Sequence, residues 1–128
     1  MPDAGGAQVC VVDDDARVRA ALASLLAAAG YRYRLFDRGA ALLAWPALDA
    51  FDLAIFDVML PDGDGFALQA RVAARHPRLP VLFMSGCGEA GLAARARAAG
   101  AVAFFHKPVD PERLLATIER VLNGREPI

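Results

Sequence analysis

Five short apolar runs alternate with stretches of helical periodicity, and this alternation limits the folds open to the chain more than any other feature. The runs are Val9–Val12, Tyr31–Phe36, Leu53–Phe56, Val81–Met84 and Val102–Phe105. Strands that alternate with helices are typical of a parallel sheet covered on both faces. The second run mixes arginines with aromatic residues, so we expect it at an edge of the sheet. The other four runs are almost wholly apolar and are expected at the centre.

Two of the intervening stretches carry clear helix signals. In the first, apolar residues recur at the spacing of one helix face, and Gly30 follows as a stop signal. In the last, Asp110 is the expected N-cap, Pro111 lies in the first turn, and the helix is expected to end at Asn123-Gly124. The apolar faces are Val18, Ala21, Leu22, Leu25, Leu26 and Ala29 in the first helix, and Leu114, Ile118, Val121 and Leu122 in the last.

Length and composition indicate one domain over residues 1–128, with a core at about 8–123. Of the 128 residues, 56% are hydrophobic, which is enough for a substantial core. The net charge is -1, so we expect no direct binding to nucleic acid or to an anionic membrane. No apolar run approaches the roughly 20 residues of a membrane span, and no signal-peptide pattern opens the chain, so the cytoplasm is the expected location. Cys10 and Cys87 lack metal or disulfide spacing and are expected to be ordinary thiols.

Polar residues follow four of the apolar runs, where the strands are expected to end. They are Asp13, Asp14 and Asp15 after the first run, Asp57 after the third, Ser85 after the fourth, and His106 and Lys107 after the fifth. In an open parallel sheet, ligands bind outside the carboxyl ends of the strands, so these residues are expected on one rim. Carboxylates brought close together repel one another unless a cation compensates their charge. Mg²⁺ suits this small set of oxygen ligands better than Ca²⁺, and zinc is disfavoured because there is no His/Cys cluster.

Such a rim is suited to phosphoryl chemistry. Beside a bound cation, an aspartate can act as a nucleophile toward a phosphoryl group, which makes Asp57 the candidate acceptor. The cation, the Lys107 ammonium and the Ser85 hydroxyl would stabilise charge on the transferring oxygens. We also expect the backbone N–H groups of Gly86 and Gly88 to lie at the start of the next helix, where they could hold phosphate oxygens.

Four motifs in this order, VVDDD, FDVMLPDGDG, FMSG and FFHKP, resemble those of the receiver domain of bacterial two-component response regulators. The resemblance covers nearly the whole chain. It implies a flavodoxin-like, doubly wound α/β fold. In that fold a five-stranded parallel sheet with strand order 2-1-3-4-5 is accompanied by five helices.

The resemblance also implies roles for individual residues. Asp57 corresponds to the phosphoacceptor, and Asp13 and Asp14 correspond to the acidic pair that organises Mg²⁺. The other correspondences are Met59 to the residue whose backbone carbonyl binds the ion, Ser85 to the hydroxyl switch, Lys107 to the phosphate-contacting lysine and Phe104 to the aromatic switch. The Lys107–Pro108 peptide bond is expected to be cis. Ser85 and Phe104 replace the more common Thr and Tyr, and a Phe ring offers no phenolic hydrogen bond, so its switching is expected to be weaker or purely steric.

By this resemblance the chain is a signalling switch and not an enzyme beyond its self-catalysed phosphorylation and slow dephosphorylation. The phosphoryl donor would be a sensor histidine kinase or a histidine phosphotransfer protein. No effector domain follows the last helix, so we expect output by contact with a downstream protein, unless the chain is a fragment of a longer regulator. The resemblance also allows a homodimer through the fourth helix, fifth strand and fifth helix, but the sequence does not fix the oligomeric state. Met59 and Cys87 are expected to flank the phosphoryl group and to tune its lifetime, in a direction that the sequence does not fix.

Two other functions compete with that of a phosphoacceptor. Gly86, Gly88 and Gly91 form a G-x-G-x-x-G motif after a strand, as in dinucleotide-binding domains. Only one strand and one helix follow this motif, whereas a dinucleotide fold needs a further half. The second competitor is a receiver-like module that signals by contact without phosphorylation. Such a module would not need the full set of acids, hydroxyl and lysine.

Other polar residues near the rim have simpler interpretations. Asp15 is expected to cap the first helix. The turn Asp62-Gly63-Asp64-Gly65 does not fit the twelve-residue calcium loop and is better explained as a turn in which Asp64 caps a helix. His106 and His76 have no partner at ligand spacing, so both are expected to be structural or exposed.

Overall fold

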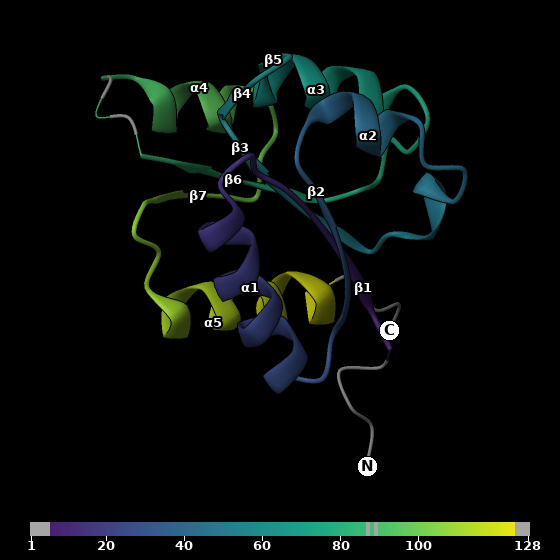
Figure 1. Ribbon diagram of the computed structural model, residues 1–128. Coiled ribbons are helices and arrows are strands. Elements are labelled where there is room, and N and C mark those ends of the chain that lie inside the picture. Colours follow the sequence, from purple (N-terminus) through teal and green to yellow (C-terminus); the bar gives the residue numbers. More distant parts are fainter. Residues whose placement is uncertain (1–5, 87, 89, 125–128) are drawn as a thin grey trace.

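Five parallel strands form a single sheet at the centre of the molecule (Figure 1). The computed structural model describes residues 6–86, 88 and 90–124. The strands are β1 (Gln8–Val12), β2 (Arg32–Phe36), β3 (Leu53–Asp57), β6 (Val81–Ser85) and β7 (Ala103–His106). Their order in the sheet is β2-β1-β3-β6-β7, which confirms the expected order 2-1-3-4-5. A small antiparallel pair, β4 (Met59–Leu60) and β5 (Gly63–Asp64), follows β3.

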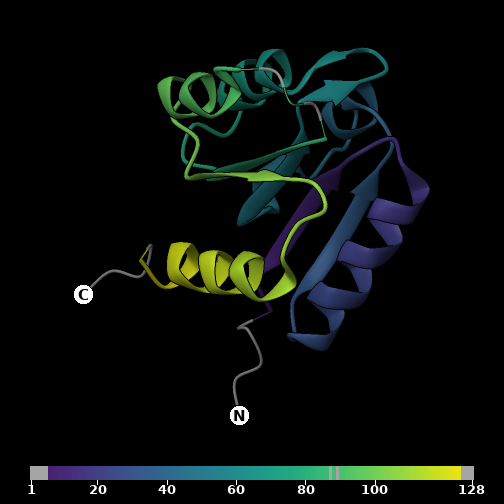
Figure 2. The same cartoon turned by 90° about the vertical axis from the view of Figure 1, so that its left-hand side faces the viewer.

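Helices cover both faces of the sheet, which gives three layers (Figure 2). The α-helices in the described part of the chain are α1 (Ala16–Ala28), α2 (Gly39–Leu43), α3 (Gly65–Ala73), α4 (Leu92–Ala98) and α5 (Pro111–Gly124), and a 3-10 turn, η1, spans Leu48–Ala50. α1 and α5 lie on one face, and α2, α3 and α4 lie on the other. This is the doubly wound arrangement that the strand-helix alternation predicts.

Alternate residues of each central strand point to opposite faces of the sheet and build two cores. In β1, Cys10 and Val12 belong to the core under α2, α3 and α4, whereas Val9 and Val11 belong to the core under α1 and α5. β3 and β6 divide their residues in the same way, and every residue of both strands is buried. Burial on two faces explains why these strands are continuous apolar runs.

The two edge strands differ in how well the sequence places them. Among the described residues β2 pairs only with β1, and its Arg32, Tyr33 and Arg34 are exposed, which confirms the expected edge position. The expectation that the fifth run lies at the centre is wrong, because β7 forms the opposite edge beside β6. The apolar sequence of β7 is explained by the two helix layers instead. Phe104 packs against the core under α2 to α4, and Phe105 packs against the core under α1 and α5.

The helix ends follow the signals in the sequence. Asp15, Asp64 and Asp110 cap α1, α3 and α5, each by accepting a hydrogen bond of 2.7 to 3.0 Å from a backbone N–H in the first turn. Gly30 has a φ of 89°, the left-handed conformation that terminates α1. Ala21, which was expected on the apolar face of this helix, is exposed.

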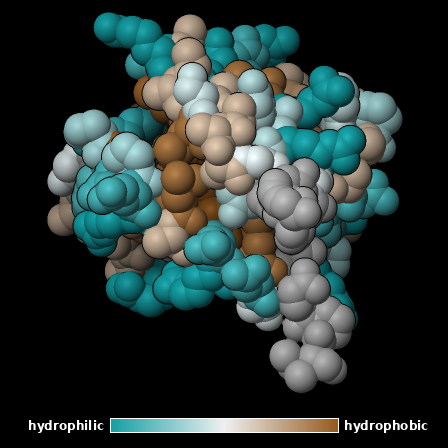
Figure 3. All heavy atoms as spheres, turned by 90° about the horizontal axis from the view of Figure 1, so that it is seen from below, coloured by the Kyte–Doolittle hydropathy of each residue, from teal (hydrophilic) through white to brown (hydrophobic). Residues whose placement is uncertain are grey.

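The outer surface around α1 and α5 is largely hydrophilic. Seen from below, where these helices lie in Figure 1, the most apolar surface gathers in a central strip with hydrophilic side chains on both sides (Figure 3). Of the helices in the described part of the chain, none combines the length and the apolarity that crossing a membrane requires.

Candidate functional site

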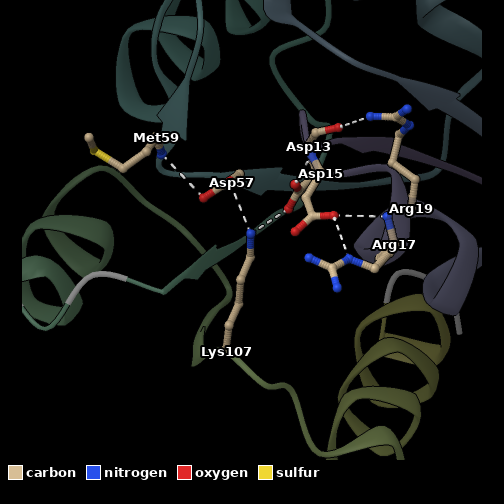
Figure 4. A network of polar contacts seen from close by, with 7 residues as sticks. All are labelled: Asp13, Asp15, Arg17, Arg19, Asp57, Met59 and Lys107. Atoms are coloured by element: carbon tan, nitrogen blue, oxygen red, sulfur yellow. Dashed lines mark hydrogen bonds and ion pairs between the residues drawn. The ribbon is translucent and has the colours of Figure 1, made fainter.

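Polar residues stand at the carboxyl ends of four neighbouring strands. Asp13 directly follows β1, Asp57 ends β3, Ser85 ends β6 and Lys107 directly follows β7. Because these four strands are parallel and consecutive in the sheet, their carboxyl ends lie on one rim. The predicted rim is therefore present, and Asp13, Asp57 and Lys107 are in direct contact on it (Figure 4).

Lys107 bridges two buried carboxylates. Its Nζ lies 2.6 Å from Oδ2 of Asp13 and donates a hydrogen bond of 3.0 Å to Oδ2 of Asp57. Asp13 is fully buried and Asp57 is 5% exposed, so bulk water does little to compensate either charge. Asp13 Oδ2 accepts no hydrogen bond of good geometry from the described residues, so the ammonium is its compensating charge.

Burial and neighbouring charges shift the pKa values of Asp57 and Lys107. Burial is the main reason that the pKa of Asp57 is raised, and the charge of Asp13 raises it further, while the hydrogen bond from Lys107 acts in the opposite direction. Burial alone would lower the pKa of Lys107, but its close contacts with Asp13 and Asp57 and the negative charges of both carboxylates outweigh burial and raise that pKa. Lys107 therefore stays protonated at neutral pH, and two carboxylates share one positive charge.

The acidic residues of the rim fit a divalent cation. One carboxylate oxygen from each of Asp13, Asp14 and Asp57 lies within 4.8 Å of the other two. Asp14 is exposed, which leaves the cluster accessible to solvent. An accessible set of oxygen ligands that leaves room for bound water is what Mg²⁺ prefers. The Asp13 oxygen without a hydrogen bond is consistent with the same ion.

Contacts on two sides hold Asp57, one with its carboxylate and one with its backbone. The Met59 N–H donates a hydrogen bond of 3.2 Å to Asp57 Oδ1, while Met59 is 62% exposed and its side chain points away from the carboxylate (Figure 4). On the other side Gly65, the first residue of α3, packs against the Asp57 backbone so closely that a Cβ there would overlap the Asp57 carbonyl oxygen. The role of the Met59 carbonyl as an ion ligand stays a prediction.

The two expected switch residues lie on neighbouring strands. Ser85 is fully buried, and its carbonyl accepts a hydrogen bond of 2.9 Å from the Lys107 N–H. Phe104 is half-buried and meets the ring of His106 edge-on, with centroids 5.1 Å apart. His106 itself is exposed, as expected. The Lys107–Pro108 peptide bond is cis, which confirms that expectation, whereas the switching roles stay predictions.

Comparison with known proteins shows which family this chain belongs to. Residues 9–119 match the response regulator receiver domain. The chain belongs to the response regulator receiver family. Receiver domains are signalling switches that typically use Mg²⁺ at an acidic pocket, and this receiver domain has such a pocket in Asp13, Asp14 and Asp57.

Individual relatives agree with this assignment. The receiver domain is 41% identical over 120 residues to the transcriptional regulatory protein FixJ of Bradyrhizobium diazoefficiens, covering 93% of this chain and 58% of FixJ. It is 38% identical over 117 residues to the DNA-binding transcriptional regulator NtrC of Rhizobium meliloti, covering 91% of this chain and 24% of NtrC. The crystal structure of a CheY-like receiver domain protein from Methanospirillum hungatei JF-1 superposes with a TM-score of 0.83 at 28% identity, covering 92% of this chain and 94% of that one. The chain thus spans about half of FixJ and a quarter of NtrC.

The dinucleotide-binding alternative is not supported. The family match includes the glycine-rich segment after β6, and the sheet has the strand order of the receiver fold. The expectation that Gly86 and Gly88 lie at the start of a helix is wrong, because α4 begins only at Leu92, directly after Gly91. Cys87 lies outside the described residues.

Polar residues away from the rim have structural partners. The His76 ring forms a hydrogen bond of 2.9 Å with the Phe51 carbonyl. Asp62, which the sequence placed only in a turn, accepts hydrogen bonds from the N–H groups of Gly39 and Ala40 at 3.1 and 2.8 Å. The bond from Ala40 is the main reason that the pKa of Asp62 is lowered. Asp62 therefore ties the loop after β3 to the first turn of α2.

One contact with the rim has no counterpart in the sequence-based prediction. Arg19 Nη1, from α1, donates a hydrogen bond of 2.7 Å to the backbone carbonyl of Asp13 (Figure 4). A sequence signal for this contact is weak, because an arginine at the margin of an amphipathic helix usually reaches solvent.

Proposed function

We propose that this receiver domain accepts a phosphoryl group on the Asp57 carboxylate from a phosphohistidine of a sensor histidine kinase or a histidine phosphotransfer protein. The main support is the Lys107 ammonium, which reaches Asp13 and Asp57 at 2.6 and 3.0 Å within the acidic cluster. A carboxylate held between a cation-binding cluster and an ammonium is arranged for attack on phosphorus. A structural ion pair would not require the third carboxylate, Asp14, at the same place.

The proposed reaction is a direct transfer. One carboxylate oxygen of Asp57 forms a bond to phosphorus while the bond between phosphorus and the imidazole nitrogen of the donor breaks. The leaving nitrogen keeps the electron pair, and because the other ring nitrogen of the donor carries a proton, the ring leaves as neutral imidazole while Asp57 becomes an acyl phosphate. Lys107 neutralises charge on the transferring group. Burial raises the pKa of Asp57 and so favours its protonated form. The Lys107 ammonium opposes this effect and favours the ionised, nucleophilic carboxylate.

Mg²⁺ is the cation that we propose for the acidic cluster. Asp13, Asp14 and Asp57 would hold it through carboxylate oxygens, and Met59 would contribute its backbone carbonyl. When bound, the ion supplies positive charge that stabilises the oxygens of the transferring phosphoryl group.

The response to phosphorylation would pass through Ser85 and Phe104. In the proposed phosphorylated state the Ser85 hydroxyl contacts the phosphoryl group, and the Phe104 ring turns inward. This would change the surface of α4, β7 and α5, where we place contact with a downstream protein or a second copy of the domain. A domain with its core at about 8–123 would be sufficient for this switch.

Acetyl phosphate with Mg²⁺ tests the phosphoacceptor directly. Intact mass spectrometry is expected to show a gain of one phosphoryl group in the wild type and none in Asp57→Asn, because the amide is a poor nucleophile. Omission of Mg²⁺ is expected to prevent most of the labelling.

The same measurement separates the alternatives. Equal labelling of the wild type and Asp57→Asn would place the acceptor elsewhere. No labelling of a folded wild type, with acetyl phosphate or with a phosphorylated phosphotransfer protein, would favour the module that signals without phosphorylation.

Met59 gives a smaller prediction about the lifetime of the acyl phosphate. Its side chain leaves the rim beside Asp57 and is largely exposed, so it presents an apolar surface to water near the acceptor. Met59→Asn, which offers water a hydrogen-bonding amide, is expected to speed loss of the phosphoryl group by about threefold, a change below 1 kcal/mol in the barrier. Decay of the labelled species, followed by mass spectrometry, measures this rate. Met59→Leu is the matched apolar control, and an unchanged rate in Met59→Asn would exclude the side chain from this role.

A further inference from the structure

The loop between β1 and α1 carries two of the three carboxylates of the acidic cluster, and its geometry depends on Asp13. The Asp13 N–H donates to the carbonyl of Phe36 at 3.1 Å, which ties the loop to the end of β2. Asp13 Oδ1 accepts a hydrogen bond of 2.9 Å from the Asp15 N–H. The Asp13 carbonyl accepts the hydrogen bond of 2.7 Å from Arg19. Three of the four polar atoms of Asp13 are thus fixed by hydrogen bonds.

The fourth atom is Oδ2, the oxygen that faces Lys107 and accepts no hydrogen bond of good geometry from the described residues. Fixing the other three atoms determines where Oδ2 points. It also fixes the start of the next residue, Asp14, whose peptide unit contains the Asp13 carbonyl that Arg19 holds. The guanidinium of Arg19 therefore acts on the one peptide group that joins the two carboxylates.

We infer that Arg19 is a positioning residue for the divalent-cation site: by holding the Asp13 carbonyl, it keeps the carboxylates of Asp13 and Asp14 in the arrangement that binds the cation. The inference rests on the proposed function to the extent that this cation is the one that supports phosphorylation. Groups outside the ligand set that orient metal ligands commonly change metal affinity by about 10- to 100-fold when they are removed.

Electrostatics alone would give Arg19 the opposite effect. A guanidinium near a cation site repels the cation, so removal of its charge would tighten cation binding if charge were its main contribution. Removal of a positioning hydrogen bond would weaken binding. The direction of the change in affinity therefore distinguishes the two roles.

Arg17 provides a matched control on the same helix. It is two residues away, and its side chain is 96% exposed. Its guanidinium contact in the structure is an ion pair of 4.0 Å with Asp15, which is not one of the three clustered carboxylates. An Arg17 variant thus removes the same charge from α1 without releasing the Asp13 carbonyl.

The test measures binding of Mn²⁺ to the unphosphorylated protein by the electron paramagnetic resonance of free Mn²⁺. Arg19→Met keeps a long stem but removes the donors, and it is expected to raise the dissociation constant by about tenfold. Arg17→Met is expected to leave the dissociation constant unchanged. Arg19→Lys keeps one ammonium donor, so its dissociation constant is expected to lie between those of the wild type and Arg19→Met. Urea denaturation of each variant shows whether it is folded under the binding conditions.

An unchanged or tighter Mn²⁺ complex in folded Arg19→Met would overturn the inference, and so would an equal loss in Arg17→Met. If Arg19→Met does not fold, Arg19→Lys is compared with the wild type instead. The inference requires Arg19→Lys to bind Mn²⁺ more weakly than the wild type. Labelling by acetyl phosphate is a separate readout. If the wild type gains a phosphoryl group while Arg19→Met binds Mn²⁺ normally, the positioning role fails and the proposed function stands.

Discussion

Replacement of Gly65 with alanine is expected to lower the free energy of unfolding by about 3 kcal/mol, the upper end of the usual cost of overpacking. A Cβ at this position would overlap the carbonyl oxygen of Asp57 and lie 3.2 Å from the ring of Phe83. Backbone atoms of a buried strand cannot move aside cheaply, so the first turn of α3 would have to shift. That shift would break the hydrogen bond of 2.8 Å from the Gly65 N–H to the Val58 carbonyl.

Urea denaturation measures this loss, and the rate of labelling by acetyl phosphate is expected to fall with it, because α3 packs on the backbone of the acceptor. Gly88→Ala is the control, since a Cβ at Gly88 would meet no atom within 4 Å. Its effect on stability is expected to stay within about 0.5 kcal/mol, as for ordinary surface substitutions. A Gly65→Ala variant as stable as the wild type would show that α3 does not pack on Asp57 in this way.

The overall topology was predictable because burial imposes a recognisable pattern of apolar residues on the sequence. Strands covered on both faces must be apolar throughout, and helices covered on one face must repeat at 3.6 residues, so the alternation in this chain allows few folds. An edge strand that helices cover on both faces is as apolar as a central strand, so hydrophobicity does not distinguish the two positions. For this reason the apolar run that contains Phe104 and Phe105 was expected at the centre, although β7 lies at an edge.

The rim was predictable for a related reason. Once the strands are parallel, the residue after each strand has a known place, so Asp13, Asp57, Ser85 and Lys107 could be brought together without any knowledge of the loops. The fit of these side chains to a cation also follows from their chemistry.

Contacts that depend on how helices dock were not predictable. Gly65 read as part of a turn, but its lack of a side chain is required by α3, which packs directly on Asp57. Asp62 also read as a turn residue, yet it reaches across to the N–H groups of the first turn of α2. The hydrogen bond from Arg19 depends on the rotation of α1 about its axis. Each contact joins elements whose relative position emerges only when the whole domain packs.

Loss of the Lys107 ammonium is the second large effect that we expect. In Lys107→Met the stem is kept, but Asp13 and Asp57 are left as two buried carboxylates without their compensating charge. Removal of one partner from a buried pair commonly costs roughly 3–5 kcal/mol; since the Lys107 side chain is 19% exposed, we expect about 2 kcal/mol at pH 7. Chemical denaturation at pH 7 measures this loss.

The loss should also depend on pH. Burial and Asp13 already raise the pKa of Asp57 in the folded protein above 3.8, the value for an unperturbed aspartate, and removal of Lys107 takes away an interaction that lowers it. A carboxyl with a raised folded pKa favours the folded state below its unfolded pKa, and this contribution disappears as the pH rises through the folded pKa. The deficit of Lys107→Met relative to the wild type should therefore grow from pH 4 upward and be largest at neutral pH.

The double variant Lys107→Met/Asp57→Asn isolates the cause. It removes one of the two carboxylates, so Asp13 no longer faces a second negative charge, and a part of the stability lost in Lys107→Met is expected to return at pH 7. The growth of the deficit with pH should become shallower, because Asn does not titrate. If the single and double variants were equally unstable at every pH, loss of packing by the lysine stem would explain the effect, and the charge balance of the rim would not. Recovery in the double variant would show that the ammonium is needed because Asp57 is ionised, which is the state that attack on phosphorus requires.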